Sequence, residues 1–309
     1  MKPLKMSLMF LKPYTNWLIL THYSSLIAEF LTYLASPALL YIKRMGYLKE
    51  AIAIDARYKR CKSAWSPHLE NSKNFIINAL KRCKNFRTVV VLGSGNLLDL
   101  PLLQLSQTFE KVILVDIVHL GKTLKTIRKF PNVVAHTCDI TETSESIFNL
   151  IKSRANTAEH IELPLPKMFH LPETQDNCPD LVISLNIFSQ LTVMPREYIL
   201  KNKASEDGPV LKRWENEVLE SHLNSLFALK TNVCLITDFE FIERNHRTQS
   251  VNQYYTLTGI NLPMPEKTWI WNIAPKGEIS KDISIERKVA AFFFSPDKQI
   301  ISIRHKNIL

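Results

Sequence analysis

The sequence predicts an α/β fold built on a mostly parallel β-sheet, and three observations support this prediction. Residues 87–116 read as strand, glycine turn, helix and strand, with Asp116 at the end of the second strand. The strand segments are short runs of valine, isoleucine and leucine, as expected of strands buried on both faces. Segments with helical apolar spacing lie between these strands, and such alternation is typical of parallel sheets.

The stretch from Arg87 to Asp116 organises the rest of the chain. Residues 88–92 form a predicted buried strand, and the run Gly93-Ser94-Gly95 then breaks it. Glycine permits positive φ and lets the backbone approach a ligand closely. Residues 97–109 have helical apolar spacing, and residues 112–115 form the next strand. Asp116 is then placed to hydrogen-bond ribose hydroxyls, as in nucleotide-binding βαβ units.

Two residues after the glycines indicate which nucleotide would bind. Dinucleotide sites use a third glycine and an uncharged helix N-terminus that faces a pyrophosphate. Here Leu97 stands near the place of that glycine, and Asp99 is expected in the first helical turn. A carboxylate there would repel a pyrophosphate and would suit a cationic ligand such as S-adenosylmethionine (SAM). The alternative is that Asp99 only complements the helix dipole, which contributes about 0.3–1 kcal/mol.

Composition limits the class of protein and its partners. The chain has 309 residues, of which 46% are hydrophobic and 22% charged, which suffices for one large or two modest globular domains. The net charge of +10 permits an acidic partner such as nucleic acid, although dispersed solvated lysines would give the same value. The cysteines contain no CxxC pair, so we expect no metal site, no disulfide framework and a reducing, cytoplasmic compartment. These cysteines are Cys61, Cys83, Cys138, Cys178 and Cys234.

The N-terminal segment, residues 1–85, is expected to be a helical extension that acts as a lid. Residues 24–42 are nearly long enough to span a bilayer, but Glu29 and Pro37 argue against spanning. Two basic residues follow this segment directly, which suits a helix lying at an interface. Residues 1–45 are therefore candidates for peripheral contact with the inner membrane surface, beside the simpler reading as packed helices.

Residues 47–84 are predicted to continue as helices, with a turn at Ser66-Pro67 because proline disfavours helix before it. Four side chains cluster in sequence near this turn, and the segment before the first strand covers the cofactor in many nucleotide enzymes. Core packing of the tryptophan and helix capping by the histidine are the structural alternatives. The four residues are Arg60, Trp65, His68 and Asn71.

A second acid follows the third predicted strand. Residues 120–127 suit an amphipathic helix, residues 132–137 form the strand, and Asp139 comes just past it. Ligands bind at the carboxyl ends of the strands in open α/β sheets. The glycine turn, Asp116 and Asp139 are therefore expected to converge.

The remaining segments complete the prediction. We expect an irregular region at 153–179, a strand at 180–185, an irregular region at 192–209, a helix at 210–230, strands at 232–237, 268–273 and 289–294, and a further strand or continuation at 299–304.

Four motifs in this order resemble those of class I, Rossmann-like SAM-dependent methyltransferases. The resemblance spans residues 87 to 294, and it implies a Rossmann-like sheet of seven mostly parallel strands with helices on both faces. The last strand would be antiparallel and inserted beside the fifth, and residues 86–309 would form the SAM-binding domain. Arg60-Cys61 and the run from Ala64 to Leu69 are also similar to a group of bacterial methyltransferase-like proteins. The four motifs are VVVLGSGNLLDLP (89–101), VILVDIVHL (112–120), AHTCDIT (135–141) and PDLVISLNIFSQL (179–191).

The resemblance implies a role for each motif. Gly93, Ser94 and Gly95 would cradle the methionyl part of SAM, with Asp99 near its ammonium group. Asp116 would hold the ribose and Asp139 the adenine. The sequence departs from the family pattern in three places: the usual acid near Val91 is absent, Leu97 replaces a glycine, and Ile187 and Phe188 replace the prolines of the amino-methylating pattern.

The function implied is methyl transfer from SAM to an unidentified acceptor. Asn186 would line the acceptor channel, and His222 could serve as a base if its side chain faced the pocket; Ser184 and Gln190 are weaker candidates. Three alternatives stay open at this stage. The missing acid near Val91 suits a catalytically silent SAM-fold binding or regulatory protein, and the N-terminal helices suit a membrane-surface protein. The third alternative is an NAD(P)-dependent oxidoreductase, against which Asp99 and the lost third glycine argue.

Overall fold

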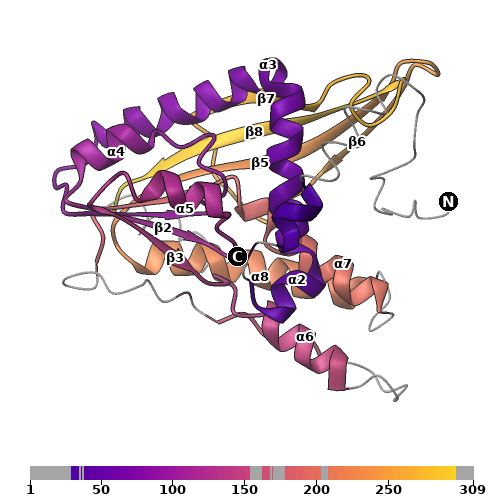
Figure 1. The fold of residues 1–309 in the computed structure, drawn as a ribbon, viewed down its shortest axis with the longest axis horizontal. Coiled ribbons are helices and arrows are strands. Elements are labelled where there is room, and N and C mark those ends of the chain that lie inside the picture. Colours follow the sequence, from indigo (N-terminus) through magenta and orange to yellow (C-terminus); the bar gives the residue numbers. More distant parts are fainter. Residues whose placement is uncertain are drawn as a thin grey trace.

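The protein is built around one mixed β-sheet with helices on both faces (Figure 1). The computed structural model describes residues 29–34, 36, 38–153, 162–167, 169, 178–202 and 208–296. The strand order along the sheet is β3-β2-β1-β4-β5-β8-β7, and β6 pairs with β5 beside this path.

The parallel part of the sheet follows the predicted strands. β1 (Thr88–Leu92) lies between β2 (Lys111–Asp116) and β4 (Leu181–Leu185), and β3 (Val133–Thr137) and β5 (Asn232–Asn245) lie outside these two. All residues of β1 and β4 are buried, as continuous apolar runs require. The carboxyl ends of the five strands therefore meet at one edge of the sheet.

The antiparallel part confirms the strand arrangement that the resemblance implied. β8 (Ile283–Phe294) runs antiparallel between β5 and β7 (Lys267–Ala274). β5 continues past its predicted end at Thr237 as far as Asn245, and there it also pairs with β6 (Ser250–Tyr255). The sequence did not predict β6, because every one of its residues is exposed and no apolar alternation marks it.

Alternate residues of the strands enter two cores, one on each face of the sheet. Val90 and Leu92 face one core and Val89 and Val91 the other. The first core is covered by α8 (Pro209–Ala228), α6 (Ser144–Ser153), α7 (Val193–Lys201) and α2 (Leu40–Met45), and the second by the C-terminal half of α3 (Tyr47–Leu80), α4 (Leu102–Thr108) and α5 (Gly121–Ile127).

The N-terminal helix α3 is one long bent helix, so the predicted turn at Ser66-Pro67 is wrong. Pro67 lies inside the helix, and the backbone leaves helical geometry at Cys61 (φ −106°, ψ 20°). Proline removes one helical hydrogen bond and clashes with the preceding turn, which accounts for a bend one to two turns before it. Figure 1 shows the two limbs of α3, the second of which runs alongside β7.

Other elements also differ from the prediction, and β8 begins at Ile283 rather than at residue 289. α4 begins at Leu102 rather than at residue 97, because Pro101 disfavours helical geometry at the residue before it. The segment predicted to be irregular at 192–209 contains α7, which accommodates Pro195 in its first turn, where the missing N–H has no intrahelical partner. The tail at 299–304 lies outside the described residues.

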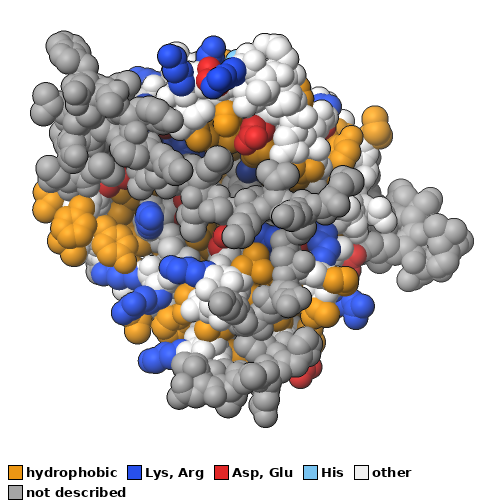
Figure 2. Space-filling view, turned by 90° about the vertical axis from the view of Figure 1, so that its right-hand side faces the viewer, with side chains coloured by type: hydrophobic (Ala, Val, Ile, Leu, Met, Phe, Trp, Pro, Cys, Tyr) orange, Lys and Arg blue, Asp and Glu red, His pale blue; other side chains and the backbone are white. Residues whose placement is uncertain are grey.

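The surface bears on the predicted membrane and nucleic-acid partners. Within the described part of the chain, no helix is both long and apolar enough to cross a bilayer. Phe30, Leu34 and Leu39 are exposed ahead of Lys43 and Arg44, while residues 1–28 of the candidate membrane segment lie outside the described residues. On the face shown in Figure 2, lysine and arginine side chains are scattered between hydrophobic side chains and do not form one continuous stripe.

Candidate functional site

The two glycines of the turn after β1 lie in different surroundings: Gly93 is closely packed and Gly95 faces open space. Gly93 has φ +80°, and a Cβ on it would lie 2.6 Å from the Cβ of Ile187, so the turn packs directly on the segment that follows β4. Gly95 has φ +49°, and a Cβ there would meet only the Gly93 carbonyl oxygen at 3.9 Å. Leu97 replaces the third glycine yet takes the same left-handed region, with φ 62°. The turn therefore keeps its shape and leaves space open above Gly95.

Asp116 is brought to this turn from the end of β2. Its Oδ2 accepts a hydrogen bond of 2.7 Å from the amide of Gly95, and its Oδ1 accepts one of 3.2 Å from the amide of Val118. Burial raises the pKa of the carboxyl group, and the amide hydrogen bonds oppose this effect. The structure thus places the predicted ribose acid and the predicted glycine cradle in direct contact.

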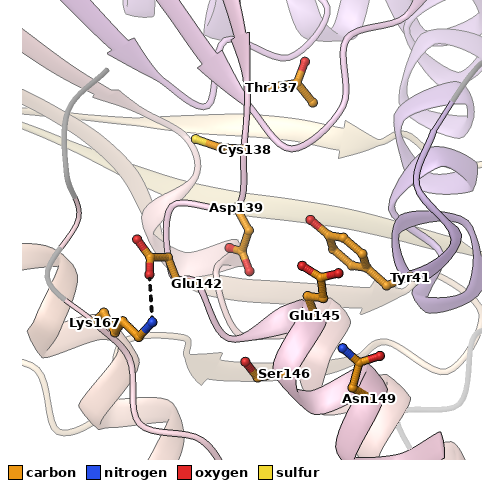
Figure 3. Close-up of a pocket in the computed structure, with 9 residues that line it drawn as sticks. All are labelled: Tyr41, Thr137, Cys138, Asp139, Glu142, Glu145, Ser146, Asn149 and Lys167. Carbon is orange, nitrogen blue, oxygen red and sulfur yellow. Dashed lines mark ion pairs between the residues drawn. The ribbon is translucent and has the colours of Figure 1, made fainter. Parts of the chain in front are cut away.

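Asp139 lies at the same edge of the sheet and lines a cavity of about 470 Å³ (Figure 3). Its carboxylate accepts hydrogen bonds from the amide of Thr141 at 2.9 Å, the hydroxyl of Thr141 at 2.7 Å and the amide of Ser144 at 2.9 Å. Both oxygens are therefore already engaged in shaping the start of α6, and adenine recognition by this side chain stays a prediction. The cavity is lined by Tyr41, Thr137, Cys138, Asp139, Glu142, Glu145, Ser146, Asn149 and Lys167.

The cavity wall has an acidic character. In Figure 3, Glu142 and Lys167 face each other as an ion pair, at 3.4 Å, and Glu145 stands on the α6 side. Burial and the nearby charge of Asp139 raise the pKa of Tyr41 to about 12, so this phenol stays protonated. Burial likewise raises the pKa of the Cys138 thiol to about 11. Among the described residues that line this cavity, the one cationic side chain, Lys167, is therefore paired with an acid.

His119 links the glycine turn to β3, and the sequence reasoning missed it. Its Nε2 lies 3.2 Å from the Ser94 hydroxyl and its Nδ1 lies 2.9 Å from the Thr137 hydroxyl. Burial lowers the pKa of the imidazole to about 4, so the ring is neutral near pH 7. The only signal in the sequence was a histidine three positions past Asp116, inside the second motif.

Asn186 and Asp99 form the second polar contact at this edge. Asn186 follows β4 in the left-handed region, at φ 49°, and its Nδ2 lies 2.6 Å from Oδ2 of Asp99. Asp99 does not lie in a first helical turn, because α4 begins later, so the helix-dipole reading of Asp99 is wrong. Burial raises the pKa of Asp99. Oδ1 of Asn186 is buried and forms no hydrogen bond with any described residue.

His68 joins this contact from α3 and is 1% exposed. Its Nε2 lies 3.4 Å from Asn186 Nδ2, and its Nδ1 accepts a hydrogen bond of 3.0 Å from the indole N–H of Trp269. Its ring also stacks on Trp271, with centroids 4.1 Å apart. Of the Trp-Ser-Pro-His run singled out in the sequence, Trp65 and His68 therefore pack on β7, and His68 reaches Asn186 after β4.

The remaining catalytic candidates have structural partners. His222 lies on the buried face of α8, is 5% exposed, and its Nε2 is 3.0 Å from the hydroxyl of Ser184. Gln190 donates to Oδ1 of Asp238, which is itself 2% exposed and paired with Arg287 at 2.9 Å. These contacts account for His222 and Ser184 as parts of the buried framework, whereas Gln190 is exposed and bonded to the buried Asp238.

Comparison with known proteins finds methyltransferases among the solved structures. No protein-family model and no curated protein matches the chain. A DhpI complex with S-adenosylhomocysteine (SAH) is 11% identical, covers 77% of this chain and 93% of its own, and has a TM-score of 0.34. For the N-methyltransferase NodS of Bradyrhizobium japonicum with SAH these values are 8%, 72%, 86% and 0.31. For the 1,6-didemethyltoxoflavin-N1-methyltransferase of Burkholderia thailandensis they are 11%, 79%, 89% and 0.32.

The fold assignment rests on the sheet itself. Five parallel strands in the order β3-β2-β1-β4-β5 are followed by β8, an antiparallel strand inserted between β5 and β7. This is the strand arrangement of class I SAM-dependent methyltransferases. The chain has this fold.

Proposed function

We propose that the protein transfers a methyl group from SAM to an acceptor that binds beside Asn186. The observation that supports this most directly is the contact between Asp116 and Gly95, at 2.7 Å, where the first two strands end. In open α/β sheets this is the edge at which ligands bind. The same edge carries Asp139, two residues past the β3 residue that pairs with Asp116.

The residues present fit SAM in three respects. The turn has open space above Gly95, where a side chain would stand in the way of a ligand. Asp116 is partly exposed, and each of its carboxylate oxygens accepts one amide hydrogen bond and keeps a further lone pair for a ribose hydroxyl. The buried Oδ1 end of Asn186 has no partner among the described residues, which is what an incomplete ligand site leaves behind.

Each group then has a proposed task. Gly93, Ser94 and Gly95 cradle the methionyl part, Asp116 binds the ribose, and Asp139 lines the adenine side. Bound SAM supplies an activated methyl group, so the chain mainly has to align the acceptor and exclude water. Asn186 orients the acceptor through its amide. His222 takes no part, because it is held by Ser184 inside the core.

Calorimetric titration with SAM, SAH and NAD⁺ tests the proposal. We expect the parent protein to bind SAM and SAH, and Asp116→Ala to lose at least tenfold in affinity for both. The matched control is Glu110→Ala, which removes an exposed acid that directly precedes the other end of the same strand and should leave the affinity within twofold. Binding of NAD⁺ without SAM, or equal SAM affinity of Asp116→Ala and the parent, would overturn the assignment.

A methyl-transfer assay separates an enzyme from a silent binding protein. Tritiated methyl-SAM, incubated with the protein and a cell extract, should leave label on one chemical fraction of the extract. SAM binding with no transfer to any fraction would instead support the regulatory alternative that the missing acid near Val91 first raised.

A further inference from the structure

Four side chains from distant parts of the chain form one polar row beside the glycine turn, in which His68 and Trp269 are buried and Asn186 and Asp99 are partly buried. Trp269 of β7 contacts His68 of α3, His68 contacts Asn186 after β4, and Asn186 contacts Asp99. The two ends of an amide have nearly the same shape, so the surrounding hydrogen bonds decide which end of Asn186 is the oxygen.

The proton on His68 is fixed by Trp269. An indole N–H can only donate, so the Nδ1 that receives it at 3.0 Å carries a lone pair. Burial lowers the pKa of His68 to about 3, so the ring is neutral and its single proton is on Nε2. This Nε2–H points at the end of the Asn186 amide that also meets Asp99, at 3.4 Å. If the amide nitrogen of Asn186 were at that place, its N–H group and the His68 Nε2–H group would both be donors and could not bond to each other.

The contact between Asn186 and Asp99 is also short for an amide donor. Its length is 2.6 Å, whereas N–H···O bonds usually measure about 2.7–3.2 Å and O–H···O bonds about 2.5–3.0 Å. The amide oxygen of Asn186 accepting from the carboxylic acid hydroxyl of Asp99 fits this length better. The reversed amide would accept from both His68 Nε2–H and a protonated Asp99, and the donor conflict would disappear.

We infer that Asp99 is a neutral carboxylic acid that donates its proton to the amide oxygen of Asn186, and that the amide nitrogen of Asn186 faces the ligand as a donor. His68 and Trp269 are then positioning residues, because they hold the amide in this orientation through the tautomer of the imidazole. The site would accordingly select a ligand oxygen, such as a carboxylate or carbonyl, at this point rather than an N–H group.

The charges around Asp99 are compatible with a proton on it. Burial is the largest influence on its pKa and raises it, and the nearby carboxylate of Asp116 adds to this. Hydrogen bonds from the Asn186 amide and from the backbone amide of Asp99, together with the charge of Lys73 of α3, act in the opposite direction. Reversing the Asn186 amide removes the first of these influences. His68 is neutral, and Asn186 bears no charge, so neither compensates an ionised carboxylate.

The protonation state does not depend on the proposed function, whereas the use of the amide nitrogen by a ligand does. Carbon-13 NMR of the full-length protein, labelled at aspartate carboxyl carbons, measures the state directly, without any ligand. We expect one carboxyl signal at the position of a protonated acid at a pH of about 6.5, well above the ordinary aspartate range, and we expect it to be absent in Asp99→Asn. An Asp99 signal at the position of an ionised carboxylate would overturn the inference.

Two tryptophan substitutions test the role of the imidazole tautomer. Trp269→Phe keeps an aromatic ring but removes the N–H that holds His68 Nδ1, so Nε2 can become an acceptor for an Asn186 amide nitrogen. We expect the Asp99 signal to move toward the ionised position in this variant. Trp271→Phe is the matched control, because Trp271 stacks on the same imidazole while its own Nε1 has no partner among the described residues. Equal Asp99 signals in the two variants would refute the positioning role.

The two proposals fail separately. If SAM does not bind the parent protein, the methyl-transfer proposal falls while the NMR result still decides the state of Asp99. If SAM binds and the Asp99 signal is that of an ionised carboxylate, the inference about Asp99 falls while the methyl-transfer proposal stands. Nitrogen-15 NMR should show the His68 proton on Nε2 in the parent protein. In Trp269→Phe it should show a mixture of the Nε2–H and Nδ1–H tautomers.

Discussion

The carboxylate of Asp116 accepts a hydrogen bond from the backbone amide of Gly95 at 2.7 Å. This bond ties the end of β2 to the turn that follows β1, so the same side chain both shapes the turn and offers oxygens to a ligand. Loss of binding in an Asp116 variant therefore has two physical sources, and stability measurements are needed to separate them.

Substitutions at Asp116 should separate shape from recognition. Asp116→Ala leaves the amides of Gly95 and Val118 without their acceptor, and an unsatisfied buried donor costs about 1–3 kcal/mol of unfolding free energy. Asp116→Asn keeps one acceptor oxygen for Gly95 and should lose about half of that. Urea unfolding followed by circular dichroism provides the comparison. Equal stability of the parent and the alanine variant would show that the turn does not need this bond.

The two glycines of the turn should respond differently to alanine. Gly93→Ala combines left-handed backbone strain, about 1–2 kcal/mol, with a Cβ placed 2.6 Å from Ile187. Overpacking adds about 1–3 kcal/mol, so we expect a strongly destabilised or insoluble variant. Gly95→Ala brings only the backbone strain. A larger loss of melting temperature for Gly95→Ala than for Gly93→Ala would contradict the described packing.

Acidic pH should unfold the protein partly through His222. Burial depresses its folded-state pKa to about 4 from an ordinary 6.5, so the unfolded chain binds more protons between these values. Stability must then fall as the pH drops from about 6.5 toward 4, by about 2 kcal/mol at pH 5 from this group. His222→Gln should flatten the slope over that window. An unchanged slope in the variant would mean that the imidazole titrates normally in the folded state.

Two glutamates, one paired with an arginine of α3 and one with an arginine just after it, should contribute differently to stability. Glu278 has a side-chain exposure of 10%, is paired with Arg60 at 2.6 Å, and lies 3.9 Å from Arg57. Glu266 pairs with Arg82 but is 42% exposed. Glu278→Gln should cost about 1–3 kcal/mol, because it weakens a buried charged contact, whereas Glu266→Gln should cost about 0–1 kcal/mol. Thermal unfolding at low and moderate salt compares the two variants.

Much of the fold was accessible from local patterns. Buried parallel strands such as β1 and β4 appear as apolar runs, and the acids at strand ends follow from the same pattern, so the residues alone were enough to place the glycine turn and Asp116. The antiparallel position of β8 came from the family resemblance and not from periodicity. Strand β6 was missed because none of its residues is buried and its pairing with β5 has no trace in its own sequence.

The polar row of the candidate site could not be predicted in the same way. His68, Asp99, Asn186 and Trp269 come from four separate segments, and their contacts depend on the bend of α3 and on β7 lying beneath it. Single residues such as His222 carry no indication of which way they face. Its helix was predicted, but only packing shows that the imidazole meets Ser184 rather than a pocket.

The bend of α3 also provides a built-in reporter. Cys61 stands at the point where the helix changes direction, is 3% exposed, and has a thiol whose pKa is raised to about 12 by burial. Cys178 is exposed and serves as an internal reference for reagent quality. The alkylation rate at Cys61, read by mass spectrometry of its peptide, therefore measures how often the bend of α3 opens to solvent. A rate that falls when SAM is added would mean that SAM binding and closure of the bend of α3 are thermodynamically coupled.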